Sequence, residues 1–244
     1  MFMRRDQLLE RMERIGRLVA KQEGALMLLA LGSIGLETER LDDYSDLDFF
    51  LIVEDGRKAR FIDNLDWLEV EPIAYQFQNT KDGHKVMYAD GIYAEFAVFD
   101  LPEMPHIAYT PGRIVWKRDE ALESFATPKL VTDVRDAAYC YEEALTNLYV
   151  GLLRERRGEK LAGFELIQVA AVNNVLKAHG ETGDPFNPTR RVEIRHPELV
   201  AGLDEWLPGY GKSVEAAAAM LRYIEARHPV NATLKREIAR LLEA

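Results

Sequence analysis

The chain reads DLDFFLIV over residues 46–53, where two acidic residues begin a continuous apolar run. Such a run predicts a buried β-strand, in which alternate side chains project from one face. Asp46 and Asp48 are therefore expected to point together from the start of this strand. Two carboxylates aimed at one point suit a divalent cation, and Mg²⁺ takes oxygen ligands from one or two carboxylates together with the phosphates of a nucleotide.

An apolar run at residues 25–31 precedes this strand and ends at Gly32-Ser33. The run predicts a second buried strand, and the Gly-Ser pair predicts a bend after it. Glycine lets the backbone approach a phosphate closely, and residues 34–40 are expected to open a short helix whose first N–H groups bind anions. The order of strand, Gly-Ser, short helix and carboxylate strand suits a magnesium-bound triphosphate.

A purely structural interpretation also fits these residues. In it, Gly32-Ser33 merely ends a buried strand. Asp46 caps a turn after Ser45, and Asp48 is a charge on an edge strand. Each half of the pattern is weak alone, because Asp-X-Asp is common on surfaces and Gly-Ser is common in turns. The combination at this spacing is more specific, and it favours a functional site.

Gly32-Ser33, a spacer over residues 34–45 and then Asp46-Leu47-Asp48 on a strand resemble the polymerase-beta-type nucleotidyltransferase superfamily. Within it, residues 43–49 and a helical C-terminal half are similar to the antibiotic nucleotidyltransferases, those acting on lincosamides and aminoglycosides. The resemblance is strongest over residues 25–118. It implies an α+β fold and a Mg²⁺-dependent enzyme that moves NMP, in the first instance AMP from ATP, to a hydroxyl of a small molecule and releases pyrophosphate.

The resemblance also implies roles for particular residues. Asp46 and Asp48 would hold one or two Mg²⁺ ions, and Gly32-Ser33 would grip the β- and γ-phosphates of the NTP. Many relatives carry a basic residue shortly after the Gly-Ser pair. Here Arg40 is the first one to follow it, so Arg40 is the substitute, and Ser45 completes the expected nucleotide-binding set.

Residues 92–99 predict another strand, in which Glu95 is the only charged residue. Burying a carboxylate alone is costly, so it must be paired or bound to a metal. We therefore expect Glu95 to be the third metal carboxylate, on the acceptor side, at a position that also matches the superfamily pattern. Two alternatives are a Glu95 that faces solvent across a one-sided sheet and a metal carboxylate at Glu71, although Pro72 beside it indicates an edge or a bulge.

The remaining hydrophobic patterns of the first half predict a sheet flanked by helices. Leu8, Met12, Ile15 and Val19 have helical spacing, and residues 57–67 predict a further helix that buries Phe61, Ile62 and Leu65. The other expected strands are residues 70–78, 84–88 and 112–119, with Asp90-Gly91 as a hairpin turn before residues 92–99.

Beyond Thr127-Pro128 the pattern is helical throughout. We therefore predict a nucleotidyltransferase catalytic domain with a mixed sheet at residues 1–127 and a helical acceptor-binding domain at residues 128–244. The apolar stripe of its first helix is Val134, Ala138, Tyr141, Leu145, Leu148 and Leu152. Residues 161–178 are expected to form the central helix, ending at Gly180 before a loop at residues 181–188, and residues 213–226 and 230–243 two more helices.

Glu142 lies at the edge of that apolar stripe, whereas Glu143 points away from it. A carboxylate at a domain rim is able to accept the proton of an attacking hydroxyl if it comes within hydrogen-bonding distance. Glu142 is therefore the candidate general base, with a solvated surface charge as the alternative.

Composition limits the classes of partner. Lys and Arg number 31 against 41 Asp and Glu, a net charge of −10, which argues against bulk binding of nucleic acid. Cys140 is the only cysteine, so no intrachain disulfide forms. The sequence has no apolar core of signal-peptide length and no stretch long enough to span a bilayer. A cytoplasmic location without membrane contact is expected, and the resemblance is compatible with a homodimer.

Two other functions stay open from the sequence. One is nucleotidylation of a protein or a tRNA-related target, which would place the label on a macromolecule. The other is a non-catalytic nucleotide-binding protein of the same fold. The presence of both Asp46 and Asp48 argues against that second alternative, since an unused pair of carboxylates costs stability through like-charge repulsion.

Overall fold

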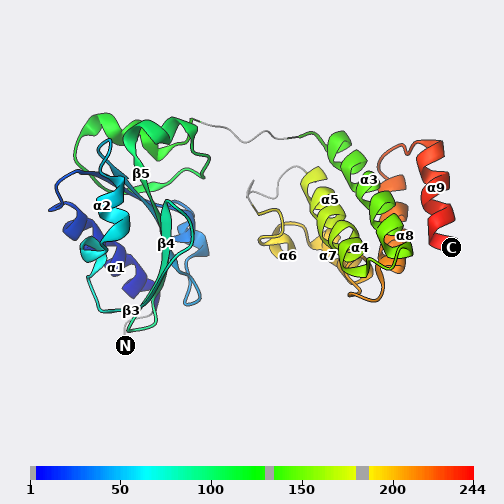
Figure 1. Ribbon diagram of the computed structural model, residues 1–244, viewed down its shortest axis with the longest axis horizontal. Coiled ribbons are helices and arrows are strands. Elements are labelled where there is room, and N and C mark those ends of the chain that lie inside the picture. Colours follow the sequence, from blue (N-terminus) through cyan, green and yellow to red (C-terminus); the bar gives the residue numbers. More distant parts are fainter. Residues whose placement is uncertain (1–3, 130–134, 180–186) are drawn as a thin grey trace. The chain divides into compact units, whose positions relative to one another are not determined.

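The computed structural model describes residues 4–129, 135–179 and 187–244. The chain divides into two compact units, Met1–Thr132 and Asp133–Ala244, which are drawn in Figure 1. The first contains a six-stranded sheet with helices, and the second is helical. The predicted α+β class is therefore confirmed. The functions predicted for residues 1–127 and 128–244 stay predictions.

The sheet of the first unit has the strand order β3-β4-β5-β2-β1-β6. Only the central pair β2 and β5 is parallel, and the other neighbours are antiparallel. The regular elements are α1 (Arg4–Val19), β1 (Ala25–Ala30), β2 (Leu47–Val53), α2 (Lys58–Asp63), β3 (Ile73–Gln78), β4 (Gly83–Tyr88), β5 (Tyr93–Asp100) and β6 (Arg113–Lys117). All the expected strands are thus present.

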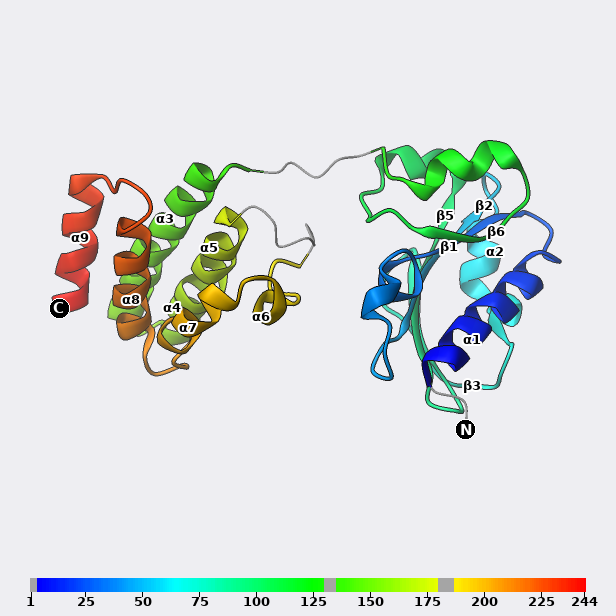
Figure 2. The same ribbon diagram turned by 180° about the vertical axis from the view of Figure 1, so that it is seen from behind.

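Helices α1 and α2 cover one face of this sheet, while residues 32–45 lie on the other side (Figure 2). The predicted spacing of α1 is confirmed, because Leu8, Met12, Ile15 and Val19 are fully buried. On the opposite face, the 3₁₀ segments Leu101–His106 and Glu120–Ala126 pack over one end of the strands. The acidic residues lie at the other end of that face.

An aromatic cluster holds β2 and β5 together on the covered face. Phe49 and Phe96 are register partners whose rings stack at 5.3 Å. Trp67 packs edge-on against both rings, at 6.3 and 5.1 Å, and its indole N–H donates to the Phe61 carbonyl oxygen at 3.0 Å. Since Phe49 follows Asp48 and Phe96 follows Glu95, this cluster fixes the backbone beneath the two carboxylates.

Two predicted helices are shorter than expected. Residues 34–40 form no α-helix but two 3₁₀ turns, Gly32–Ile34 and Thr38–Arg40, separated by a bend at Gly35. Residues 57–67 give the short helix α2 and a 3₁₀ turn at Asp66–Leu68. Phe61, Ile62 and Leu65 are nevertheless buried as predicted. Tight packing against the sheet, rather than helical propensity, determines the conformation of both segments.

The Asp90-Gly91 turn between β4 and β5 is confirmed. Gly91 has φ +83°, a conformation open to glycine at little cost. Its N–H donates to the Tyr88 carbonyl oxygen at 2.9 Å, and the Tyr88 N–H donates to Ile92 at 2.9 Å. This turn sets the β4–β5 register, in which Lys85 lies opposite Glu95.

The second unit is built around α3 (Ala137–Arg156), which packs against α4, α5, α8 and α9. Residues 161–178 are therefore not the central helix as predicted, and Leu161 is exposed. They are divided into α4 (Lys160–Phe164), a π-helical segment (Glu165–Ala171) and α5 (Val172–Ala178). The later helices are α6 (Val192–Arg195), α7 (Pro197–Trp206), α8 (Ser213–Glu225) and α9 (Ala232–Glu243).

The predicted helices at residues 213–226 and 230–243 are confirmed as α8 and α9, whereas α6 and α7 were not expected. Within the stripe of α3, Tyr141, Leu145, Leu148 and Leu152 are buried but Ala138 is exposed. Val134, Gly180 and residues 181–186 lie outside the described residues. Among the helices that the structure describes, none is long and apolar enough to cross a bilayer.

Candidate active site

The centre of the candidate site is a row of acidic side chains across β2 and β5. Asp48 and Glu95 are register partners on these parallel strands, and partners in a sheet project from the same face. Asp46 lies just before β2, and its carboxylate is close enough to act on Tyr93 of β5, as those of Asp48 and Glu95 do. Asp46 and Asp48 are both half-buried. The structure therefore brings the three predicted carboxylates onto one surface.

Glu95 is held on its outer side by two neighbours. Lys85 of β4 places Nζ 3.2 Å from Glu95 Oε2, and the Asn79 side-chain amide donates to Glu95 Oε1 at 3.1 Å. The hydrogen bond that Lys85 donates to Glu95 raises the pKa of Lys85, which keeps its ammonium group charged. The pairing required of a carboxylate in this strand is thus supplied by the protein. The Glu95 side chain is 41% exposed, so it stays accessible to a ligand.

The charged groups around Tyr93 affect the pKa of its hydroxyl group. Partial burial is the main cause of the raised pKa of Tyr93, whereas the positive charge of the nearby Lys85 lowers that pKa. Glu95, Asp46 and Asp48 add to the rise, because each carboxylate disfavours a second negative charge. Tyr93 therefore stays protonated at neutral pH, and it lies two residues before Glu95 on the same face of β5.

Gly32 and Arg40 adjoin Asp48 on the β1 side. Gly32 has φ +56°. A Cβ at Gly32 would lie 3.5 Å from Arg40 Nη2 and 3.9 Å from Asp48 Oδ2, so the glycine leaves space between a cation and a carboxylate. Arg40 also pairs with Glu37. In the part of the chain that the structure describes, its buried Nε has no hydrogen-bond partner. A phosphate oxygen is a fitting acceptor for such a donor.

Gly35 allows the chain to turn back tightly after Gly32-Ser33. Its N–H donates to the carbonyl oxygens of Leu31 and Gly32, each at 3.0 Å. A Cβ here would lie 2.6 Å from the Ala30 carbonyl oxygen and under 3.0 Å from the Leu31 backbone. Only glycine fits without a backbone shift. Ser33 is half-buried within the turn that this packing fixes.

Ser45 stabilises the loop before Asp46 through local hydrogen bonds. Its hydroxyl accepts a hydrogen bond from the Asp42 N–H at 3.0 Å and donates to Asp42 Oδ1 at 3.2 Å. The Tyr44 N–H donates to the same Asp42 oxygen at 2.8 Å. The structure therefore gives Ser45 a local folding contact, and its predicted role in nucleotide binding stays a prediction.

The donor set fits Mg²⁺, which prefers carboxylate and phosphate oxygens. Asp46 and Asp48 supply such carboxylate oxygens, and the missing side chain of Gly32 leaves the gap between Arg40 and Asp48 unfilled by a Cβ. In the described ranges, no three His, Cys, Asp or Glu side chains are close enough to form a ready-made metal site. Both carboxylate oxygens of Glu95 instead have protein partners, Lys85 and Asn79.

Two other carboxylates considered from the sequence have different partners. Glu71 accepts from Arg14 of α1 at 2.8 Å, so it belongs to the covered face and not to the acidic row. Glu142 lies on α3 in the second unit, where its Oε1 is 2.8 Å from His228 Nε2. Its role as a general base stays a prediction.

Lys85, Asn79 and Tyr93 are contacts of the acidic row that the sequence alone did not predict. A signal for Lys85 was available, since the Asp90-Gly91 turn fixes the register that places it across from Glu95. Tyr93 was detectable by the same two-residue alternation that joins it to Glu95. Asn79 lies in the turn after β3, and no periodicity marks such a residue.

Comparison with known proteins gives structural likenesses only. No protein-family model matches the chain, and no curated protein matches it. Among solved structures, the chain is similar to an aminoglycoside 6-adenyltransferase from Bacillus subtilis, with a TM-score of 0.35 and 12% identity over 96% of this chain and 91% of that one. It is also similar to the STING-associated CdnE c-di-GMP synthase from Capnocytophaga granulosa, with a TM-score of 0.32 and 13% identity over 98% of this chain and 78% of that one. At these scores neither likeness assigns a reaction, so the function depends on the site itself.

Proposed function

We propose that this chain is a Mg²⁺-dependent nucleotidyltransferase that moves NMP, in the first instance AMP from ATP, to a hydroxyl of a small molecule. The observation that carries the proposal is the pairing of Asp48 with Glu95 across β2 and β5, with Asp46 directly before β2. The Gly32–Arg40 segment supports it, because it places a cation and an open backbone bend beside Asp48.

In the proposed reaction, the acceptor hydroxyl oxygen forms a bond to the α-phosphorus of the NTP. The bond from that phosphorus to the bridging oxygen breaks, and pyrophosphate leaves. The hydroxyl proton passes to a base, for which Glu142 is the candidate from the sequence. One or two Mg²⁺ ions bound by Asp46 and Asp48 would neutralise phosphate charge, and a pair of ions would stabilise both the attacking and the leaving oxygen.

The protein contributes mainly by positioning and by charge. Gly32 and Ser33 would hold the β- and γ-phosphates, with Arg40 neutralising part of their charge. Glu95 would supply the third carboxylate on the acceptor side, where Lys85 and Asn79 keep it in place. Ser45 would act through the loop that carries Asp46.

The test is a screen for pyrophosphate release. We expect release only when Mg²⁺, an NTP and a hydroxylated acceptor are all present, with aminoglycosides and lincosamides as the first acceptors. EDTA should abolish release, and excess Mg²⁺ should restore it. Radiolabel from the NTP should move to a small product. Label on a protein or RNA would support the macromolecular alternative instead, and no transfer under any condition would contradict the proposal.

A further inference from the structure

Three exposed apolar side chains share the sheet face of the acidic row. They are Tyr75 and Phe77 of β3 and Met87 of β4, with exposed fractions of 56%, 52% and 41%. We call this set the apolar patch. Large apolar side chains gathered on a solvent-facing sheet surface commonly mark a binding site.

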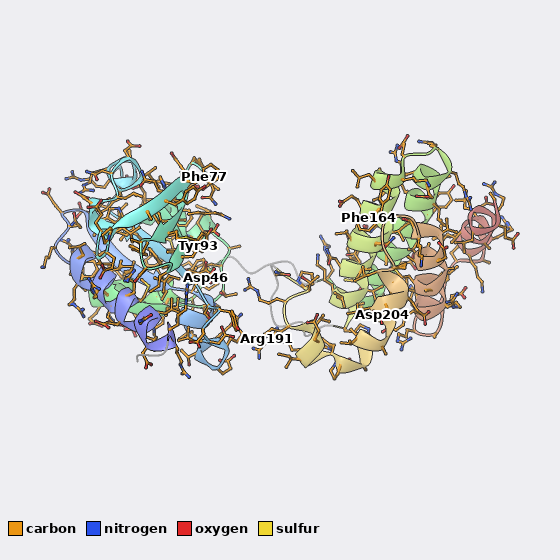
Figure 3. The ribbon with its side chains drawn as sticks, turned by 90° about the horizontal axis from the view of Figure 1, so that it is seen from below. Asp46, Phe77, Tyr93, Phe164, Arg191 and Asp204 are labelled. Atoms are coloured by element: carbon orange, nitrogen blue, oxygen red, sulfur yellow. The ribbon has the colours of Figure 1, made fainter. Side chains whose placement is uncertain are left out.

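Sheet register places the apolar patch in line with the site. Tyr75 lies opposite Met87, which lies opposite Tyr93. In the next row, Phe77 lies opposite Lys85, which lies opposite Glu95 and then Asp48. Figure 3 shows Phe77, Tyr93 and Asp46 along one side of the first unit. Neighbouring strands are about 4.8 Å apart, so the Phe77 backbone is roughly 10 Å from that of Glu95.

The two ends of these rows differ in chemistry. Gly32 and Arg40 lie on the β1 side of Asp48, whereas the apolar patch lies beyond Glu95 on the β4 and β3 side. In phosphoryl-type transfer the attacking and leaving oxygens stand roughly in line on opposite sides of the phosphorus. A pyrophosphate leaving toward Gly32 therefore requires the acceptor to approach from the side of Glu95 and the apolar patch.

We infer that the apolar patch binds an apolar ring or alkyl group of the acceptor whose hydroxyl attacks the α-phosphorus. The inference rests on the proposed function and makes its substrate class narrower. The preferred acceptors are amphipathic molecules that carry a hydroxyl roughly 10 Å from an apolar group, the span of two strand spacings.

The test is a steady-state comparison of the full-length chain with a Tyr75→Ser, Phe77→Ser double variant. Both positions are exposed, so the substitutions leave the core intact. We expect the KM for an amphipathic acceptor to rise about tenfold, in the range typical for lost apolar contacts in a substrate pocket. The KM for the NTP and the melting temperature should not change. Gln76→Ser is the matched control, because Gln76 is an exposed residue of the same strand that points to the opposite face.

The other outcomes separate this inference from the proposed function. Suppose that the wild-type chain transfers NMP. If the double variant then has an unchanged KM for the acceptor, or equal increases in the KM for the acceptor and the KM for the NTP, the inference is overturned and the proposed function stands. The same holds if only fully polar acceptors react. If the double variant converts a dimer to a monomer or lowers the melting temperature, the patch is covered by protein and the inference fails. A wild-type chain that binds no magnesium-NTP overturns both.

Discussion

Replacing Asp48 with Asn is expected to lower kcat for NMP transfer by about 10³-fold or more, the scale associated with losing electrostatic stabilisation of a transition state. The amide keeps the size of the side chain but removes its negative charge and one metal-binding oxygen. Asp48 is the residue that faces both Glu95 and the Gly32–Arg40 side, so its loss affects both ends of the site. Pyrophosphate release under saturating NTP and acceptor measures the effect.

The fold should survive this substitution. Asp48 is half-buried. Removing its charge relieves repulsion with the neighbouring carboxylates but also ends its attraction to Lys85, so the melting temperature of the variant is expected to stay close to that of the wild-type chain. Asp55→Asn is the matched control, because Asp55 is exposed and follows the opposite end of β2. Activity of Asp48→Asn equal to that of Asp55→Asn would show that the site is wrongly assigned.

Replacing Trp67 with Ala is expected to destabilise the first unit by about 3–5 kcal/mol, the usual cost of truncating a buried aromatic side chain. Trp67 is fully buried and packs against the stacked pair Phe49 and Phe96. The change leaves a cavity and leaves the Phe61 carbonyl oxygen without its indole donor. Chemical denaturation followed by circular dichroism measures the loss.

The effect of Trp67→Ala should extend to activity, since the cavity adjoins Phe49 and Phe96, the residues that follow Asp48 and Glu95. Tyr44→Ala is the stability control, because Tyr44 is an aromatic residue that is 97% exposed, and such surface changes usually shift stability by less than about 0.5 kcal/mol. Equal unfolding midpoints for the two variants would disprove the supporting role of the aromatic cluster.

The strands that carry the candidate carboxylates were predictable because they depend on short-range rules. An apolar run marks β2 with Asp48 near its start, and a lone charge in a second apolar run draws attention to Glu95. The pairing of β2 with β5 is a contact between segments far apart in sequence, and the run at 92–99 does not itself specify that neighbour. Its parallel register is what places Glu95 directly beside Asp48.

The predictions that were wrong depend on tertiary packing, which a hydrophobic pattern in the sequence does not specify. Gly35 lies against the Ala30 and Leu31 backbone, and this close approach produces two 3₁₀ turns where the residues predict a helix. Leu161 is apolar yet exposed, so the count of apolar residues overstated the burial of residues 161–178. Helix α7 was not predicted as a separate element, because it spans only Pro197–Trp206 and buries few residues, Leu199 and Trp206 among them.

Calorimetric titration with a nonhydrolysable ATP analogue, with and without Mg²⁺, tests most directly whether Asp46 and Asp48 form a metal-nucleotide site. We predict saturable binding to the wild-type chain that requires Mg²⁺ and is lost in both Asp46→Asn and Asp48→Asn, while Asp55→Asn binds normally. Absence of binding by the wild-type chain, or binding of equal strength with and without Mg²⁺, would contradict the assignment of this site.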